Sequence, residues 1–236
     1  GLLQGYLDMM GVPYGCCNVL ASALTFDKHT CNTYLKSYGV NVADSVMLIR
    51  GMAYDVNEII NEVGLPCFVK PNAEGSSFGV TKVKEAAQLE DALKKAFALC
   101  QEVLIETFID GTELTCGVVK AGDMDIAMPI AEVIPKNEFF DFEAKYDPTK
   151  SDEIIPARIS PELTNRIKTL SSMIYDILRC EGIIRVDYIV RDDEIFMLEV
   201  NTTPGMTSNS FVPKMVRAMG GTLREVLTKI IDNKLN

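Results

Sequence analysis

Hydrophobic positions recur at helical spacing in several stretches of the chain, and most of these stretches have recognisable start or stop residues. Residues 20–37 end near Gly39, and residues 55–63 are followed by Gly64, a residue type that commonly terminates helices. Farther along, Ser160 stands at a cap position and Pro161 at a first helical position. The pattern predicts helices at 20–37, 55–63 and 86–100, from Pro161 to about Cys180, and at 221–235.

Shorter apolar or alternating runs between these stretches predict β-strands. The expected strands cover 67–70, 80–84, 102–108, 113–120 and 125–135, and a β-hairpin covers 183–201. Helices alternate with strands, but some strands also follow one another directly, which indicates an α+β fold in two lobes divided near residues 113–125. The polar, aromatic-bearing stretch 136–153 has no clear period and is long enough to predict a functional loop.

The composition restricts the possible chemistry. The chain has 236 residues, 47% of them hydrophobic and 24% charged, as in soluble globular proteins, and its apolar runs are shorter than the roughly 20 residues of a membrane helix. The formal net charge of −10 argues against a nucleic-acid binder, which needs clustered Lys and Arg. Seven cysteines without C-x-x-C spacing favour a reducing, cytoplasmic setting. A single histidine, His29, argues against a His-based metal site or triad.

The hairpin at 183–201 carries the first group of candidate residues. Arg185 and Asp187 are two apart on one strand, and Glu199 and Asn201 are two apart on the other. If the connecting loop has an odd number of residues, all four side chains project from one face. Hard oxygen ligands of mixed charge suit Mg²⁺. The alternative interpretation is a solvent-exposed polar face on a half-buried sheet.

Two further stretches are weaker signals by themselves. KPNAEGSSFG, residues 70–79, can turn backbone N–H groups toward phosphate oxygens, although it is not a Walker A sequence and can equally be a hairpin turn. In EVLIETFIDGTE, Glu106 and Glu113 could accept hydrogen bonds from an adenine amino group or a ribose hydroxyl, while backbone groups of 107–109 read the base edge. The alternative for this stretch is a surface hairpin with solvated acids.

The order of these motifs resembles the ATP-grasp superfamily, and more closely its D-alanine:D-alanine ligases. The resemblance extends from LQGYLDMMGVPY and SALTFDK through VKPNAEGSSFGV, EAKY and IIRVDYIV to LEVNTTPGMTSNSFVP, and so covers essentially the whole chain. It implies two α+β lobes whose antiparallel sheets clamp ATP. It also implies the family reaction, in which ATP phosphorylates the carboxylate of one D-alanine and the amine of a second attacks the acyl phosphate, for peptidoglycan precursor synthesis.

The resemblance also assigns roles to residues. For the nucleotide, it implies that Lys28 and Lys70 bind phosphates and that Phe139 lies against the adenine ring. Acids and backbone groups of Glu106, Phe108, Ile109 and Glu113 are expected to bind adenine and ribose. For the metal, it implies that oxygens of Asp187, Glu199 and Asn201 hold two Mg²⁺ ions, with Mn²⁺ as a possible substitute.

For the reacting groups, the resemblance implies that Lys145 contacts the transferred phosphate and that Arg185 and the backbone N–H of Gly205 face the oxyanion. Ser210 and the backbone of Phe211 are expected to hold the carboxylate of the second substrate. Tyr146 and Ser76 are expected to form a lid contact that excludes water. Water would hydrolyse an acyl phosphate, so a lid has a physical purpose.

The resemblance finally implies a division of the chain. We expect residues 1–24 to follow an N-terminal domain that family members carry, 25–113 to form the small lobe, and 114–236 the large lobe with the metal and substrate site. Without that domain, the chain is expected to bind ATP and Mg²⁺ but to turn over D-alanine poorly, and the parent protein to be a homodimer with no nucleic-acid or membrane partner. Three alternatives remain: another ATP-grasp carboxylate–amine ligase, a non-catalytic nucleotide-binding module, or a structural α+β domain.

Overall fold

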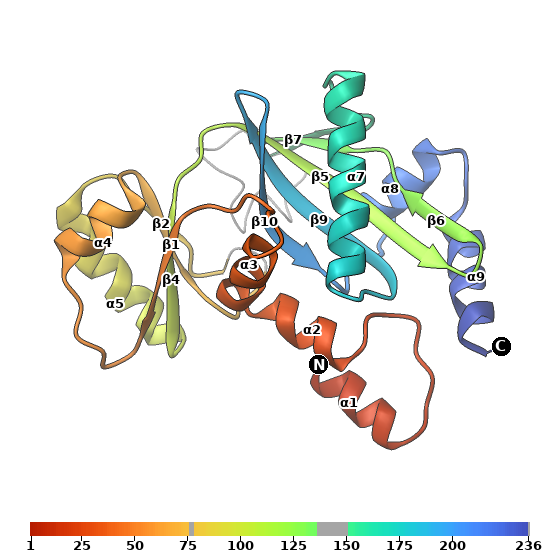
Figure 1. The fold of residues 1–236 in the computed structure, drawn as a ribbon, viewed down its shortest axis with the longest axis horizontal. Helices are drawn as coiled ribbons and strands as arrows, with labels where there is room; N and C mark the ends of the chain where they lie inside the picture. The colour runs from red at the N-terminus through yellow and green to blue at the C-terminus, as the bar shows by residue number, and fades with distance from the viewer. Residues whose placement is uncertain (76–77, 136–150, 236) are drawn as a thin grey trace. The chain divides into compact units, whose positions relative to one another are not determined.

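The computed structural model describes residues 1–75, 78–135 and 151–235 (Figure 1). The chain divides into two compact units. The terminal unit consists of Gly1–Thr25, Thr112–Val133 and Glu153–Asn236, and the central unit of Phe26–Gly111 and Ile134–Asp152. No helix among the described residues is both long enough and apolar enough to cross a membrane.

The central unit contains a four-stranded antiparallel sheet in the order β1-β4-β2-β3. Its strands are β1 (Ser45–Ile49), β2 (Cys67–Pro71), β3 (Thr81–Val83) and β4 (Glu102–Thr107). Its helices are α3 (Lys28–Lys36), α4 (Val56–Val63), the short 3₁₀ helix η1 (Ala86–Gln88) and α5 (Leu89–Leu99).

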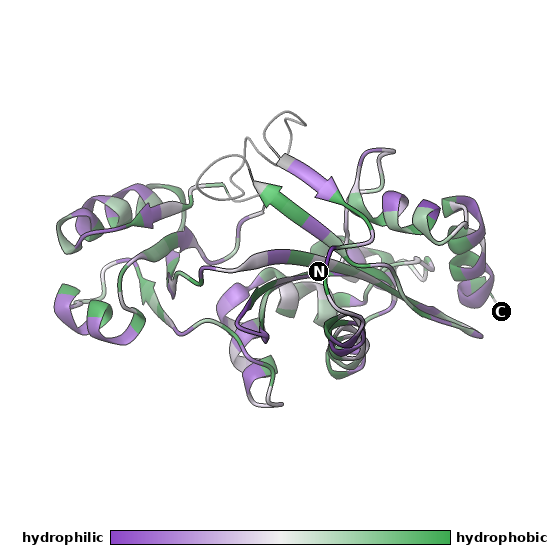
Figure 2. Ribbon diagram, turned by 90° about the horizontal axis from the view of Figure 1, so that it is seen from above, coloured by the Kyte–Doolittle hydropathy of each residue, from purple (hydrophilic) through white to green (hydrophobic). Residues whose placement is uncertain are grey.

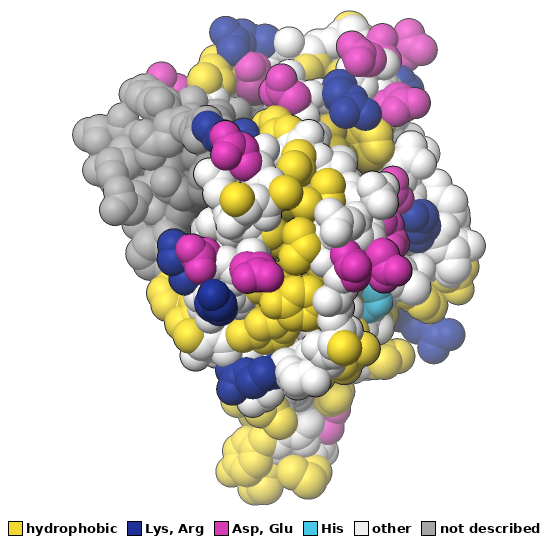
Figure 3. Space-filling model, turned by 90° about the vertical axis from the view of Figure 1, so that its left-hand side faces the viewer, with side chains coloured by type: hydrophobic (Ala, Val, Ile, Leu, Met, Phe, Trp, Pro, Cys, Tyr) yellow, Lys and Arg dark blue, Asp and Glu magenta, His cyan; other side chains and the backbone are white. Residues whose placement is uncertain are grey.

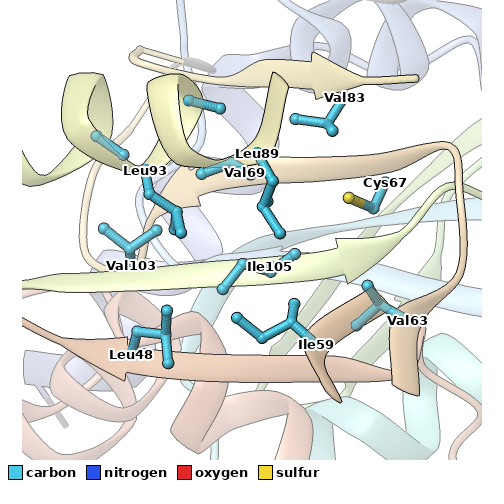
Figure 4. Close-up of a cluster of buried hydrophobic side chains, with 12 residues drawn as sticks. Leu48, Ile59, Val63, Cys67, Val69, Val83, Leu89, Leu93, Val103 and Ile105 are labelled. Carbon is cyan, nitrogen blue, oxygen red and sulfur yellow. The ribbon is translucent and has the colours of Figure 1, made fainter. Parts of the chain in front are cut away.

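Alternation along β2 and β4 gives this sheet one apolar face and one face that carries both apolar and charged residues, called here the polar face. Val69 and Ile105 are directly opposed and fully buried, and they pack with Leu89 and Leu93 of α5 and with Ile59 of α4 (Figure 4). The residues next to Val69 and Ile105 on each strand point to the opposite face. That face therefore carries Phe68 and Lys70 of β2 and Leu104 and Glu106 of β4. The candidate residues Lys70 and Glu106 thus share one face of the sheet, because the residues next to them, Val69 and Ile105, point into the core on the other face.

The expected single helix at 20–37 is wrong, since two helices occupy this stretch. They are α2 (Val19–Phe26) and α3, and Asp27 separates them. The backbone of Asp27 is extended, with φ −86° and ψ 101°, and its carboxylate accepts a hydrogen bond of 2.8 Å from the N–H of Thr30. Asp27 is therefore an N-cap that starts a new helix, and it makes Lys28 the first residue of α3.

The terminal unit is built on a six-stranded sheet in the order β10-β9-β5-β7-β8, with β6 also paired to β5. The pairs β10–β9, β9–β5, β5–β7 and β5–β6 are antiparallel. Its strands are β5 (Thr112–Ala121), β6 (Met124–Ala127), β7 (Ala131–Pro135), β8 (Ser151–Ile154), β9 (Gly182–Arg191) and β10 (Glu194–Asn201). Its helices are α1 (Leu2–Met9), α2, α7 (Pro161–Ile177), α8 (Phe211–Ala218) and α9 (Leu223–Leu235).

Helices cover both faces of this sheet. On one face α7 crosses β5 and β9, and the Ser171 hydroxyl of α7 lies 2.7 Å from the Tyr188 hydroxyl of β9 (Figure 1). On the other face Val212 and Met215 of α8 and Ile230 of α9 pack with residues of β5, β6 and β9. Hydrophobic and hydrophilic residues alternate along these elements (Figure 2), as expected for elements with one buried face.

One alternative and one expectation about the strands are wrong. The stretches 102–108 and 113–120 do not form a surface hairpin, because β4 pairs with β1 and β2 whereas β5 pairs with β6, β7 and β9 of the other sheet. The stretch 125–135 is not one strand but two, β6 and β7. Pro129 lies between them and has no N–H to donate to a ladder, which explains the break.

Candidate functional site

The hairpin of β9 and β10 brings four candidate side chains together. Asp187 lies directly opposite Glu199, and Arg185 directly opposite Asn201. The expectation of an odd loop is wrong, because the loop contains only Asp192 and Asp193, both with positive φ. A register shift between Met197 and Glu199 supplies the extra residue instead. The predicted clustering is thus achieved by a β-bulge.

The Asp187 carboxylate is the centre of a hydrogen-bonded network. Arg185 donates to it through Nε and Nη2, each at 2.8 Å, and the Thr115 hydroxyl of β5 donates at 2.5 Å. Asn201 donates through Nδ2 to Asp187 at 3.1 Å and to Glu199 at 3.4 Å. With only 8% of Asp187 exposed, this set of bonds fixes the acid and the guanidinium relative to one another. Thr115 was not predicted, and its register opposite Asp187 is visible only in the sheet.

The guanidinium of Arg185 remains charged in this environment. Burial lowers its pKa, but the neighbouring Asp187 carboxylate, together with Glu199 and Glu113, outweighs burial and raises the pKa above its ordinary value. The site therefore holds a permanent positive charge beside two carboxylates.

The donor set fits a hard divalent cation. Among residues 1–75, 78–135 and 151–235 no group of three or more His, Cys, Asp and Glu could hold a metal, and the hairpin offers two carboxylates and one carboxamide. Carboxylate and amide oxygens are ligands that Mg²⁺ accepts, with water or substrate completing its shell. Asn201 directs its Nδ2 toward both acids, so its amide would turn to present Oδ1 to a cation.

The turn that follows β10 continues this site toward α8. A Cβ atom on Gly205 would lie 2.8 Å from the Ser210 Oγ, so only glycine allows this approach without displacing the hydroxyl. The Ser210 hydroxyl lies 2.8 Å from that of Thr207, and the next residue, Phe211, has its ring centre 5.5 Å from the Arg185 guanidinium carbon. The structure thus brings Gly205 and Ser210 together and joins Phe211 to the hairpin.

In the central unit, Lys70 and Glu106 form an ion pair on the polar face of the sheet. Their side chains are only 15% and 7% exposed, and Asn32 of α3 donates a hydrogen bond of 3.3 Å to Glu106. The sequence assigned the two residues to different parts of a nucleotide, and the structure pairs them with each other. Asn32 was not predicted, because its contact with β4 depends on how α3 packs.

Lys28 contacts the loop between β2 and β3. Its Nζ donates to the carbonyl oxygens of Glu74 at 2.5 Å and Asn72 at 3.5 Å. Asn72, which is fully buried, accepts from the His29 N–H at 2.9 Å and donates to Glu102 at 3.0 Å. The loop joins two antiparallel strands, as a hairpin turn does, and it is also tied to the start of α3.

Phe108 and Ile109 follow β4, and Glu113 lies on β5. The ring of Phe108 meets that of Phe68 edge to face, with ring centres 5.7 Å apart, and Ile109 is 5% exposed. Glu113 pairs with Val133 and Ile189, so Glu106 and Glu113 belong to different sheets. Four further candidates, Ser76, Phe139, Lys145 and Tyr146, lie outside the described residues.

Comparisons with known proteins agree with one another. A family model described as the D-ala D-ala ligase C-terminus matches residues 34–232. D-alanine–D-alanine ligases of Bacteroides fragilis (strain YCH46) and Bacteroides thetaiotaomicron are 56% and 57% identical to the chain over 235 residues, which are 99% of the chain and 72% of each relative.

Two solved structures are also similar. A D-alanine–D-alanine ligase from Bacillus anthracis complexed with ATP has a TM-score of 0.85 and 33% identity, covering 100% of this chain and 74% of that one. The VanG D-Ala:D-Ser ligase from Enterococcus faecalis has a TM-score of 0.86 and 36% identity, covering 99% and 68%. With its antiparallel sheets and clustered hairpin residues, the chain has the α+β ATP-grasp fold and belongs to the D-alanine–D-alanine ligase family.

Proposed function

We propose that the chain carries the nucleotide, metal and second-substrate sites for ATP-dependent ligation of two D-alanines, which supplies a peptidoglycan precursor. The observation that supports this most directly is the directly opposed pair Asp187 and Glu199, flanked by Arg185 and Asn201. Family membership supplies the reaction, and this arrangement supplies the charges that the reaction needs.

The hairpin residues would stabilise charge as it develops. Asp187, Glu199 and Asn201 would hold Mg²⁺, which neutralises phosphate charge when bound. Arg185, kept charged and fixed by its two bonds to Asp187, would face the oxyanion that forms when the amine attacks the acyl phosphate. The N–H of Gly205 would be a second donor to that oxyanion.

The start of α8 would bind the carboxylate of the second D-alanine. Ser210 is the N-cap of α8 and makes no side-chain capping bond, so its hydroxyl is not committed to the helix. Phe211 begins the helix, where backbone N–H groups and the helix dipole favour an anion. The Ser210 hydroxyl and the Phe211 N–H would therefore hold the carboxylate and direct the amine toward the acyl phosphate.

The central unit would bind ATP. Lys28 and Lys70 would contact phosphates, and Glu106 with the backbone at Phe108 and Ile109 would contact the base. The family pattern assigns the ribose contact to Glu113. The N–H groups of Thr107 and Phe108 already donate to the carbonyl oxygens of Asp44 at 3.0 Å and Pro66 at 3.2 Å. The amide of Ile109 makes no hydrogen bond to the described residues and is therefore the N–H we assign to the base edge.

The remaining roles follow from the family pattern. Phe139 would lie against adenine, Lys145 would contact the transferred phosphate, and Tyr146 with Ser76 would close the site. We propose a cytoplasmic location, which the lack of any disulfide among the described residues supports. On the face shown in Figure 3, Lys and Arg are interspersed with Asp and Glu, a mixture that supports the absence of a nucleic-acid partner.

The ligation itself is tested with two proteins. One is the chain, and the other is a chimera in which the chain replaces the matching part of the Bacteroides fragilis relative, which is longer by the 28% that the chain does not cover. D-Alanine-dependent ADP release with formation of the dipeptide is expected from the chimera. The chain alone is expected to turn over D-alanine poorly. A chimera that folds and binds ATP but forms no dipeptide would refute the proposal. D-Serine, offered as a competing second substrate, distinguishes D-Ala–D-Ala ligation from the D-Ala–D-Ser ligation named for one of the solved neighbours.

Nucleotide and metal binding are tested on the chain itself. ATP is expected to raise its melting temperature only when Mg²⁺ is present, by an amount set by ligand concentration over affinity. Glu199→Gln is expected to weaken this Mg²⁺-dependent shift, whereas the exposed-acid variant Asp176→Asn is expected to keep it. Equal shifts in both variants would contradict a metal role for Glu199.

A further inference from the structure

A half-buried lysine contacts the aromatic residue that precedes the expected base-reading amide. On the polar face of the central sheet, Lys82 of β3 lies directly opposite Phe68 of β2. Phe68 lies in turn directly opposite Glu106 of β4. Lys82 therefore belongs to the same row of side chains as Glu106 and to the same face as the ion pair of Lys70 and Glu106, although no motif in the sequence singled it out.

The ring of Phe108 is held from two sides. The Lys82 Nζ lies 3.6 Å from its ring centre, and the Phe68 ring meets it edge to face at 71°. Such an ammonium–ring contact is attractive, and it strengthens as the groups leave water. Among the described residues Lys82 forms no ion pair with a carboxylate, so the ring is the contact that accounts for the position of its charge.

Hydrogen bonds also hold the backbone next to this ring, and the Ile109 amide is the group that they leave without a bond among the described residues. The Thr107 hydroxyl donates to the Val63 carbonyl oxygen at 2.7 Å, in addition to the bonds that the N–H groups of Thr107 and Phe108 make to Asp44 and Pro66. Ile109 is 5% exposed, which anchors its side chain. The orientation of the Ile109 amide therefore depends on residue 108, whose side chain is fixed by Phe68 and Lys82.

We infer that Lys82 is a positioning residue for the nucleotide base, acting through the Phe108 ring on the Ile109 amide. The inference rests on the proposed function, since it requires that ATP binds to the central unit. It predicts that the contribution of Lys82 to affinity depends on the base and not on the phosphates. A lysine that only attracted phosphate by its charge would act on both.

Isothermal titration of the chain in Mg²⁺ tests this with ATP and inorganic triphosphate, which has no base. Lys82→Met is expected to weaken ATP binding roughly two- to fivefold, the range of an exposed to half-buried cation–ring contact, and to leave triphosphate binding unchanged. Lys82→Arg is expected to restore ATP affinity, because a guanidinium also binds an aromatic face. The charge-matched control Lys95→Met, on the exposed side of α5, is expected to change neither affinity.

Two results would overturn the inference. One is an equal loss of ATP and triphosphate affinity in Lys82→Met, which would mean a general effect of charge; the other is unchanged ATP affinity. A double variant is the second check: in a Phe108→Leu background, Lys82→Met is expected to have no further effect on ATP affinity. If the unaltered chain bound no ATP at all, the proposed function would fail first, so the two failures are distinguishable.

Discussion

Asp187 and Glu199 lie directly opposite each other although the two-residue loop between their strands would pair them differently. Continuing the register of Met197 with Tyr188 would place Glu199 opposite Val186. The shift at Leu198 moves Glu199 by one position. Met197 stays buried opposite Tyr188, while Glu199 lies opposite Asp187. One extra residue thus gives the strand a core side chain and a site side chain two positions apart.

Removing the charge of Asp187 is expected to destabilise the protein. In Asp187→Asn the Arg185 guanidinium, whose side chain is 16% exposed, loses its paired carboxylate and retains the weaker attraction of Glu199, at 4.0 Å, and of Glu113. A buried charge without its partner costs several kcal/mol, so we expect a loss of roughly 2–4 kcal/mol in the free energy of unfolding. Urea unfolding of the two proteins measures it.

The matched control for this experiment is Asp176→Asn. Asp176 pairs with Lys120 but is 64% exposed, so its loss is expected to cost less than about 1 kcal/mol. Equal losses in the two variants would contradict a special role of the Asp187 network.

The sequence predicted those parts of the fold that depend on local patterns. Helix α7 begins at Pro161 with Ser160 as its cap, as expected, because the cap and the first-turn proline are local signals. Helix α4 and the β9–β10 hairpin are also confirmed. In contrast, β1 and α8 were not predicted: β1 is a five-residue strand whose place is set by pairing with β4, and α8 contains Pro213.

The candidate site was predictable as a set of residues but not as a set of contacts. The family pattern named Lys70 and Glu106, yet their mutual ion pair depends on β2 lying beside β4, which are more than thirty residues apart in sequence. Thr115, Asn32 and Lys82 carry no local signal, since each becomes a partner only through sheet register or helix packing. The odd-loop hypothesis failed for a related reason, because a bulge cannot be read from alternation alone.

The pair of Lys70 and Glu106 is expected to be strongly coupled. Lys70→Met leaves the Glu106 carboxylate buried without a cation, which is expected to cost roughly 3 kcal/mol in the free energy of unfolding. The double variant Lys70→Met/Glu106→Gln removes both charges, so its loss is expected to be clearly smaller than the sum of the single losses. Denaturant unfolding of the four proteins gives the coupling energy.

The exposed pair of Lys36 and Asp44 is the reference for this cycle. Their side chains are 61% and 67% exposed, and we expect a coupling energy below about 1 kcal/mol. A coupling for Lys70 and Glu106 as small as that of the exposed pair would show that solvent reaches the polar face of the central sheet.

The contribution of Glu132 to stability is expected to depend on pH. Hydrogen bonds from the Arg158 side chain, at 3.0 and 2.6 Å, lower the pKa of the Glu132 carboxyl below its ordinary value, against the opposing effect of burial. A lowered pKa in the folded state stabilises the protein at pH values above the unfolded pKa of about 4.3, and this stabilisation is lost as pH falls through the folded pKa.

Arg158→Gln tests this dependence. Unfolding free energies of the unaltered chain and the variant are expected to differ by a constant amount above about pH 5, and the difference is expected to shrink progressively below about pH 4.3. Arg224→Gln, an exposed arginine on α9, is expected to show no such change with pH. A difference for Arg158→Gln that persisted unchanged at pH 2 would mean that Arg158 acts by packing and not through the Glu132 charge.

Adding one methyl group at Gly205 is expected to impair substrate binding without unfolding the protein. The new Cβ would lie 2.8 Å from the Ser210 Oγ, which can move only by leaving its 2.8 Å contact with Thr207. Loss of one hydrogen bond to a carboxylate corresponds to roughly 1.5–3 kcal/mol, so Gly205→Ala in the chimera is expected to raise the KM for the second D-alanine at least about tenfold. Initial rates at varied D-alanine measure it.

The effect of Gly205→Ala is expected to run through Ser210, and a cycle of variants isolates that route. Ser210→Ala alone should raise the same KM, and adding Gly205→Ala to it should raise the KM little further, because the displaced hydroxyl is already absent. Gly5→Ala, in α1 where alanine is favoured, is the matched control. Among the described residues outside its own helix, the nearest atom to the new Cβ would be a methyl carbon of Val19 at 3.8 Å. Fully additive effects of Gly205→Ala and Ser210→Ala would instead assign the loss to the Gly205 backbone, independently of the hydroxyl.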